Sequence, residues 1–268
     1  MGDAPHSLKR RARAGAARAA RSFRRGAAAL ALLSAFTFFG PAEAAAQKGF
    51  TKEYPATPNV RLFLINRSGT VEVIAWERAK VKVSARMESS STRVVPQVSG
   101  DDVTIDVERE NREDKGDVNF TVYVPAYSTV DIQTKRGNII VRNVRGSVVR
   151  ARVSTEGDIE LTGIRSQMVV AENIMGNILF DAELLDGGTY ELKSTQGDIQ
   201  LRINADAGFR LTATAPRTRN IDVNGFAGRG QFEFFNDKRK VIGKVGNGGA
   251  KLNTTNTLGS ISIAPRTR

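Results

Sequence analysis

One eight-residue motif occurs twice in the chain, and this repeat constrains the fold more than any other feature. "STEGDIEL" begins at Ser154, and "STQGDIQL" begins forty residues later, at Ser194. The glycine of the motif recurs at intervals of 20, 19 and 21 residues, at Gly137, Gly157, Gly176 and Gly197. A period near 20 residues, with a glycine in every copy, indicates a solenoid in which each copy forms one rung.

Two apolar residues follow each glycine at positions two apart, so both point to the same side of their strand. These pairs are Ile139 and Val141, Ile159 and Leu161, Ile178 and Phe180, Ile199 and Leu201, and Ile221 and Val223. Neighbouring strands lie about 4.8 Å apart, so stacked rungs would join these side chains into one continuous core. Before Gly157, apolar residues alternate with Arg150 and Arg152, whose side chains we expect to face water.

The turn around each glycine carries polar residues. Glycine suits a corner that needs a positive φ angle. The next residue is Asn138, Asp158, Asn177 or Asp198. We expect these side chains to accept hydrogen bonds from nearby backbone N–H groups in Asx-type turns. Three residues before the glycines stand Thr134, Ser154, Asn173 and Ser194. We expect these small side chains to satisfy backbone groups at the bend.

Two-residue alternation recurs along the rest of the chain, and no segment of ten or more residues has a convincing helical period. We therefore predict an all-β protein, a β-helix or β-solenoid-like stack. Residues 47–128 form an irregular N-terminal β region continuous with the repeats, and residues 129–268 form the repeat region. The strands expected in the first region are Val60–Asn66, Thr70–Trp76, Lys80–Met87, Asp102–Glu108 and Val118–Pro125. Within it, "NRSGTVEV" is an early copy of the repeat.

The period breaks near the C-terminus. A degraded copy at Arg219–Val223 is followed by residues 225–249, and "TTNTLGSISI" at Thr254–Ile263 then restores the motif. We interpret residues 225–249 as an excursion that caps part of the core before a final rung. The alternative is a ligand-binding loop, because long irregular loops often carry function.

Residues 1–46 have the pattern of a cleaved signal peptide. Seven arginines lie between Arg10 and Arg25, an apolar run of 13 residues spans Ala27–Phe39, and small residues for cleavage follow at 42–46. A membrane-spanning helix needs about 20 apolar residues, so we expect no stable transmembrane span after cleavage. The pattern predicts an exported protein of the periplasm, cell envelope or extracellular space.

Half of the net positive charge belongs to this leader. Residues 1–46 hold eight of the 40 Lys and Arg and two of the 28 Asp and Glu, so the net charge falls from +12 to +6 when they are removed. No concentrated basic face with stacking aromatics is evident, so we expect no nucleic-acid partner. Arg142, Arg145, Arg150 and Arg152 form a local basic cluster. It is either a solvated face or a contact for an anionic polymer, such as acidic polysaccharide or lipid head groups.

Several kinds of chemistry are excluded by composition. The chain has no cysteine, and its one histidine, His6, lies in the leader. Disulfides, thiolate chemistry, histidine-based triads and histidine metal sites are therefore excluded from the exported form. One Asp or Asn per turn is too few for a calcium site of about six to eight oxygens. We expect no catalytic residue, no cofactor and no metal.

A carbohydrate-active enzyme is the catalytic alternative. Asp158 and Asp198 lie two rungs apart, which places them about 10 Å from each other. This approaches the carboxylate spacing of inverting glycosidases. However, Asn177 occupies the rung between them, and Gly-Asp is an ordinary turn pair.

The motifs together resemble a bacterial family. They are "NRSGTVEVIAW", "VYVPAYSTVDIQTKRGNIIV", the two repeated phrases and "TTNTLGSISI", within Asn59–Ala264. In order and spacing they are similar to the putative-adhesin domain-of-unknown-function family, which is found in exported envelope proteins and is related to proteins of cell-envelope stress operons. The resemblance implies a β-helix-like or β-roll fold at the envelope and an adhesive role. It supplies no catalytic residues.

The leading functional hypothesis is a non-enzymatic exported envelope protein, an adhesin or scaffold that binds surface polysaccharides or envelope proteins. A regular stack displays its outward residues in rows, for example Glu160, Leu179 and Gln200. Such rows suit extended partners. The alternative is an envelope-stress regulatory partner that acts by binding a membrane protein.

Overall fold

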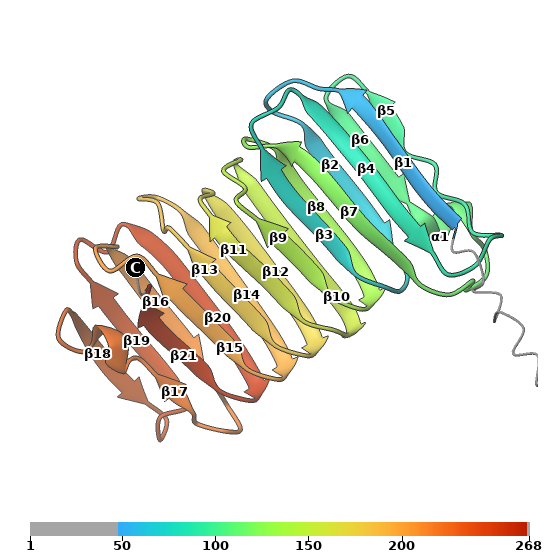
Figure 1. Cartoon of the computed structure of the whole chain (residues 1–268). Helices are drawn as coiled ribbons and strands as arrows, with labels where there is room; N and C mark the ends of the chain where they lie inside the picture. The colour runs from blue at the N-terminus through green and yellow to red at the C-terminus, as the bar shows by residue number, and fades with distance from the viewer. Residues whose placement is uncertain (1–47, 267–268) are drawn as a thin grey trace, which may run out of the picture. The chain divides into compact units, whose positions relative to one another are not determined.

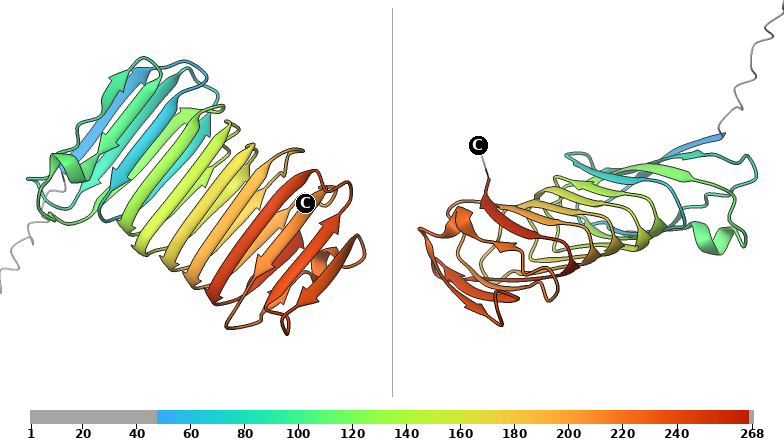
Figure 2. Two further views of the ribbon diagram at one scale, coloured as in Figure 1. Left: turned by 180° about the vertical axis from the view of Figure 1, so that it is seen from behind. Right: turned by 90° about the horizontal axis from the view of Figure 1, so that it is seen from below.

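The computed structural model describes residues 48–266, which form two large β-sheets packed face to face (Figures 1 and 2). Sheet A has ten strands, in the order β1 (Lys48–Pro55), β4 (Lys80–Met87), β7 (Val118–Pro125), β3 (Val71–Trp76), β9 (Ile139–Arg142), β11 (Ile159–Ile164), β13 (Ile178–Ala182), β15 (Ile199–Ile203), β21 (Ile261–Pro265) and β17 (Ile221–Asp222). Sheet B has eleven, in the order β18 (Gly230–Phe235), β19 (Lys240–Val245), β16 (Phe209–Thr214), β20 (Ala250–Leu258), β14 (Thr189–Gln196), β12 (Met168–Met175), β10 (Val148–Glu156), β8 (Thr129–Arg136), β2 (Arg61–Asn66), β6 (Asp102–Asp106) and β5 (Gln97–Ser99). The leader expected at residues 1–46 lies outside the described residues.

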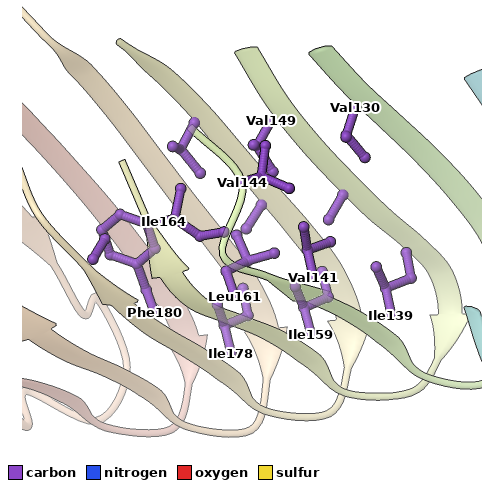
Figure 3. Close-up of a cluster of buried hydrophobic side chains, with 14 of the residues drawn as sticks. Val130, Ile139, Val141, Val144, Val149, Ile159, Leu161, Ile164, Ile178 and Phe180 are labelled. Atoms are coloured by element: carbon purple, nitrogen blue, oxygen red, sulfur yellow. The ribbon is translucent and has the colours of Figure 1, made fainter. Parts of the chain in front are cut away.

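Each regular rung consists of one strand of sheet B, a glycine corner and one strand of sheet A. Rungs stack by parallel pairing in register, so Ile159 lies opposite Ile139 on one side and Ile178 on the other. The predicted ladder of apolar pairs is therefore confirmed. Its side chains fill the space between the sheets, where Ile139, Leu161 and Phe180 are fully buried (Figure 3). The side chains of Arg150 and Arg152 are exposed, as expected.

The order of the rungs departs from the order of the chain at both ends of the stack. Near the C-terminus, β21 pairs with β15 on one side and β17 on the other. The last rung of the chain, β20–β21, thus inserts between the fourth regular rung, β14–β15, and the degraded copy. The sequence period predicts instead that the degraded copy stacks directly on the fourth rung. Near the N-terminus, β2 and β3 likewise lie between the rung β6–β7 and the rung β8–β9.

The degraded copy, which occupies the end of the stack, lacks the corner glycine. Arg219 stands in the glycine's place with φ of 59°. Its neighbour Thr218 donates a hydrogen bond from Oγ1 to the carbonyl oxygen of Gly259, at 2.6 Å. The corners of the rungs from β8–β9 to β20–β21 all carry glycine.

Residues 225–249 are more regular than an excursion. The segment continues the short 3₁₀ helix η1 (Asn224–Phe226), which begins one residue before it, and contains the antiparallel pair β18 and β19, which extends sheet B beyond β16. Phe226 is buried and its ring meets that of Phe209 edge-on, with centroids 5.3 Å apart. The hairpin β18–β19 lengthens sheet B (Figure 1). The expected capping role is confirmed in part, since η1 packs against β21 and its Phe226 is buried.

The N-terminal half contains all five expected strands, with small changes at their ends. The main difference is that Val107 and Glu108 leave β6 and begin the one-turn helix α1 (Val107–Glu110). Asp106 caps this helix, because its side chain accepts a hydrogen bond from the backbone N–H of Arg109. Strands β1 and β5 were not expected; they pair antiparallel with β4 and β6 at the outer edges.

Candidate functional site

The Asx residues at the corners link neighbouring rungs, which corrects the expectation of turns closed within one rung. The Oδ1 atom of Asp158 accepts a hydrogen bond from the backbone N–H of Asn177, at 2.7 Å. Asn177 accepts in the same way from Asp198, at 2.9 Å. Asp198 accepts from both the backbone N–H and the hydroxyl of Ser260, each at 2.7 Å. The corner is thus a chain of hydrogen bonds along the stack, and it bridges the inserted last rung.

The small polar residues before the glycines satisfy backbone carbonyls, as predicted. Thr134 donates from its hydroxyl to the carbonyl of Arg136, at 2.9 Å, and Asn173 donates from its amide to Gly157, at 3.3 Å. Both side chains are nearly fully buried. These residues therefore stabilise the bend rather than present a site.

A shallow depression of about 390 Å³ lies along this corner. Its lining includes Asp158, Glu156 and Arg136. It does not include Asp198, so the two carboxylates of the enzyme alternative do not converge on it. The hydrogen bonds from the backbone and hydroxyl of Ser260 lower the pKa of Asp198. A general acid needs the opposite shift, since it must hold its proton near neutral pH.

The four arginines of the predicted basic cluster do not form one patch. Arg142 pairs with Glu72 and Glu160 on the outer face of sheet A. Arg150 and Arg152 lie on the outer face of sheet B, on the other side of the stack, each with its own carboxylate. Arg145 pairs with Glu77, at 3.6 Å. Residues that are close in the sequence are therefore divided between the two faces by the glycine corner, so the four arginines do not present one joint surface to an anionic polymer.

The outer face of sheet A carries the expected row. Glu160 lies opposite Leu179, and Leu179 lies opposite Gln200. The row continues to Ser262 at one end and through Ile140 to Glu72 at the other. It crosses six neighbouring parallel strands without a change of register. The result is a long, flat face on which equivalent positions repeat at every rung.

An aromatic pair lies on neighbouring strands β3 and β7 of sheet A. The rings of Trp76 and Tyr123 stack with centroids 5.0 Å apart. Arg78 lies over the ring of Trp76, at 5.1 Å, and Lys82 lies over that of Tyr123, at 6.0 Å. Because both rings already have cationic neighbours, the cluster stabilises the sheet locally. No sequence pattern pointed to it, since β3 and β7 lie far apart in the chain.

Two observations concern the described residues alone. Within residues 48–266 no three carboxylate, histidine or cysteine side chains gather in a group able to hold a metal ion. No helix in that part of the chain is long and apolar enough to cross a bilayer.

The likeness to solved structures is distant in sequence. A crystal structure described as a putative cell adhesion protein from Clostridium sporogenes is 12% identical, with a TM-score of 0.49, and the match covers 82% of this chain and 100% of that one. A putative adhesin from Bacteroides fragilis is 10% identical, with a TM-score of 0.32, and the match covers 81% of this chain and 98% of that one. A putative lipid binding protein from Parabacteroides distasonis is 10% identical, with a TM-score of 0.30, and the match covers 82% of this chain and 97% of that one. No curated protein matches the chain.

A family match covers more than half of the sequence. It extends from residue 113 to residue 264, and so includes all four regular rungs, the hairpin and the inserted last rung. The chain belongs to the Toastrack DUF4097 family.

Proposed function

We propose that this is a non-enzymatic, exported envelope protein, an adhesin or scaffold that binds extended surface polymers or envelope proteins through its sheet faces. The observation that carries the proposal is the row of outward positions from Glu72 to Ser262, which crosses six parallel strands in register. A long partner can contact several positions of this row at once, so weak contacts add up. The adhesive role implied by the family resemblance agrees with this geometry.

Binding rather than catalysis is supported by how the corner carboxylates are used. Asp158 and Asp198 each accept hydrogen bonds from the next rung, so they hold the stack together. Export is supported by the leader pattern of residues 1–46.

The experiment is a retention assay with the exported form, residues 47–268. Purified cell-wall glycans, surface polysaccharides and solubilised envelope proteins are immobilised separately. We expect retention on at least one extended polymer or envelope protein. A variant with Glu160→Lys and Gln200→Lys should be retained less, because both changes alter the row on sheet A. The matched control is Glu191→Lys with Gln133→Lys, which makes the same two kinds of change on the outer face of sheet B, away from the row on sheet A.

Each outcome separates the hypotheses. Retention by an envelope protein alone, confirmed by co-purification from crosslinked envelopes, would favour the regulatory partner. Glycan cleavage that Asp158→Asn and Asp198→Asn abolish without unfolding the protein would establish the enzyme instead. Retention on none of the materials would contradict the proposal.

A further inference from the structure

The outer face of sheet B pairs opposite charges across neighbouring strands along much of its length. Arg61 lies directly opposite Asp102, Arg150 opposite Asp131, and Arg152 opposite Glu172. Each of these register partners also forms an ion pair. Opposite charges at facing positions stabilise a sheet, whereas like charges destabilise it.

One row near the C-terminal end breaks this rule. Lys251 on β20 lies directly opposite Arg210 on β16, and Arg210 lies directly opposite Lys244 on β19. All three side chains are exposed, and in the described part of the chain no carboxylate forms an ion pair with any of them. Adjacent strands are about 4.8 Å apart, so three positive charges stand in a line along the stack. We name Lys251, Arg210 and Lys244 the basic row.

The row ends in a depression. Lys244 faces Gln231 across the β18–β19 pair, and both line a hollow of about 450 Å³. Arg229 also lines it, and its guanidinium donates one hydrogen bond to the carbonyl of Ala205, at 2.7 Å. Since a guanidinium carries five N–H donors, most of them remain for a ligand. The row and the hollow thus form one track of four cations.

The local structure holds this arrangement in place. Gly248, in the turn between β19 and β20, has φ of 70°. A Cβ on this glycine would stand 3.0 Å from Cε of Lys244 and 3.2 Å from Cγ of Arg210. Both basic side chains therefore pack against the glycine turn, so their stems lie side by side instead of diverging. Their positive charges are held close together, and a bound anion would relieve the repulsion between them.

We propose that the basic row and its hollow bind an acidic polysaccharide. A linear polyanion matches charges that lie in a single line, and the rows beside it supply uncharged partners for sugar hydroxyls, such as Asn253 and Thr212 on the same face. An anionic bilayer fits less well, because the carboxylate of Glu233 lies on this face within the β18–β19 hairpin. The inference rests on the proposed function and names the polymer class that one end of the stack takes.

The test measures binding to polygalacturonate, with dextran as the uncharged polymer. The test variant carries Arg210→Gln, Lys244→Gln and Lys251→Gln. The matched control carries Arg61→Gln, Arg150→Gln and Arg152→Gln, which removes three charges from the same face at paired positions. We expect the test variant to lose about tenfold or more in affinity and the control less than about threefold. Added salt should weaken wild-type binding, because exposed charges are screened. Circular dichroism establishes that both variants are folded.

Three outcomes would overturn this inference. The first is equal binding by the test variant and the wild type. The second is binding to phosphatidylglycerol vesicles but not to polygalacturonate. In the third, the wild type binds other envelope polymers or proteins but no polyuronate, so the proposed function stands and the basic row is not its polyanion site. A protein retained on no material at all would fail both proposals.

Discussion

A methyl group added to Gly197 would overlap the carbonyl oxygen of Gly176, one rung away. The same relationship joins Gly157 to Gly137 and Gly259 to Gly197. The corner glycines therefore have two reasons to be glycine: each has a positive φ, and each lies against the backbone of a neighbouring corner. Close stacking of rungs, rather than the turn alone, selects glycine at these positions.

Replacing Gly197 with alanine should be severely destabilising. The substitution combines an unfavourable φ of 116° with overlap against backbone that cannot move aside. We expect a loss of about 3 kcal/mol or more in the free energy of unfolding, measured by urea denaturation. Gly187→Ala isolates the conformational part, since φ is 76° but nothing lies near its Cβ, and should cost about 1 kcal/mol. Equal losses for the two variants would show that contact between corners is unimportant.

Tyr190→Phe should destabilise the protein although the ring is kept. The hydroxyl of this buried tyrosine donates to the carbonyl of Ser166, at 2.9 Å, and accepts from the backbone N–H of Leu185, at 2.8 Å. Removing it leaves two backbone groups unpaired, at a cost of about 1 to 3 kcal/mol. Tyr127→Phe, at an exposed site, should be neutral in the same thermal denaturation series. A neutral Tyr190→Phe would mean that water replaces the hydroxyl freely.

Alkaline pH should unfold the protein partly through Tyr190. Burial raises the pKa of this phenol above its ordinary value of 10.0. The folded state then holds a proton that the unfolded chain releases, so stability is intact below pH 10 and falls as the pH rises toward the folded pKa. Burial also raises the pKa of Tyr54, so tyrosinate absorbance should show two phenols that ionise late. Only the ionisation of Tyr190 should accompany unfolding, and this coupled change should be missing in Tyr190→Phe; if it persists, another tyrosine is responsible.

The charge on Asp198 should make the free energy of unfolding depend on pH in the acid range. Hydrogen bonds from Ser260 lower the pKa of this carboxyl below its ordinary 3.8, so its contribution is present above about pH 4 and is lost as the pH falls through the folded pKa. Asp198→Asn keeps the acceptor oxygen, as Asn177 does in its own rung. We expect this variant to lose less stability than the wild type between neutral and acid pH in urea titrations. Parallel acid profiles would exclude a role for the Asp198 charge.

The sequence predicted what a rung contains but not where each rung stacks. The Gly-Asx-Ile phrase defines the corner, the core ladder and the outward positions, because all of these depend on residues within one copy. Every copy presents nearly the same edge, so the motif does not specify its neighbour. The degraded copy, which ends the stack, differs from the regular copies by Arg219 in place of the glycine.

The candidate surfaces were predictable to a smaller extent. The row through Glu160 follows from periodicity, so it was found. The basic row combines Lys251, Arg210 and Lys244, which become neighbours only because the last rung inserts beside β16 and the hairpin folds back on it. The sequence alone pointed instead to a basic cluster at the arginines around Arg150. These are close in the chain but are divided between two faces of the structure.

The most direct test of the stack uses crosslinks in a chain that has no native cysteine. In the structure Gln200 lies opposite Ser262, and Ser262 separates it from Asp222. Neighbouring strands lie within the Cα separation that a disulfide spans, about 4.4 to 6.8 Å, whereas strands two apart do not. Gln200→Cys with Ser262→Cys should therefore form an intramolecular disulfide under mild oxidation, and Gln200→Cys with Asp222→Cys should not. The reverse result would place the rungs in the order of the chain and contradict the inserted last rung.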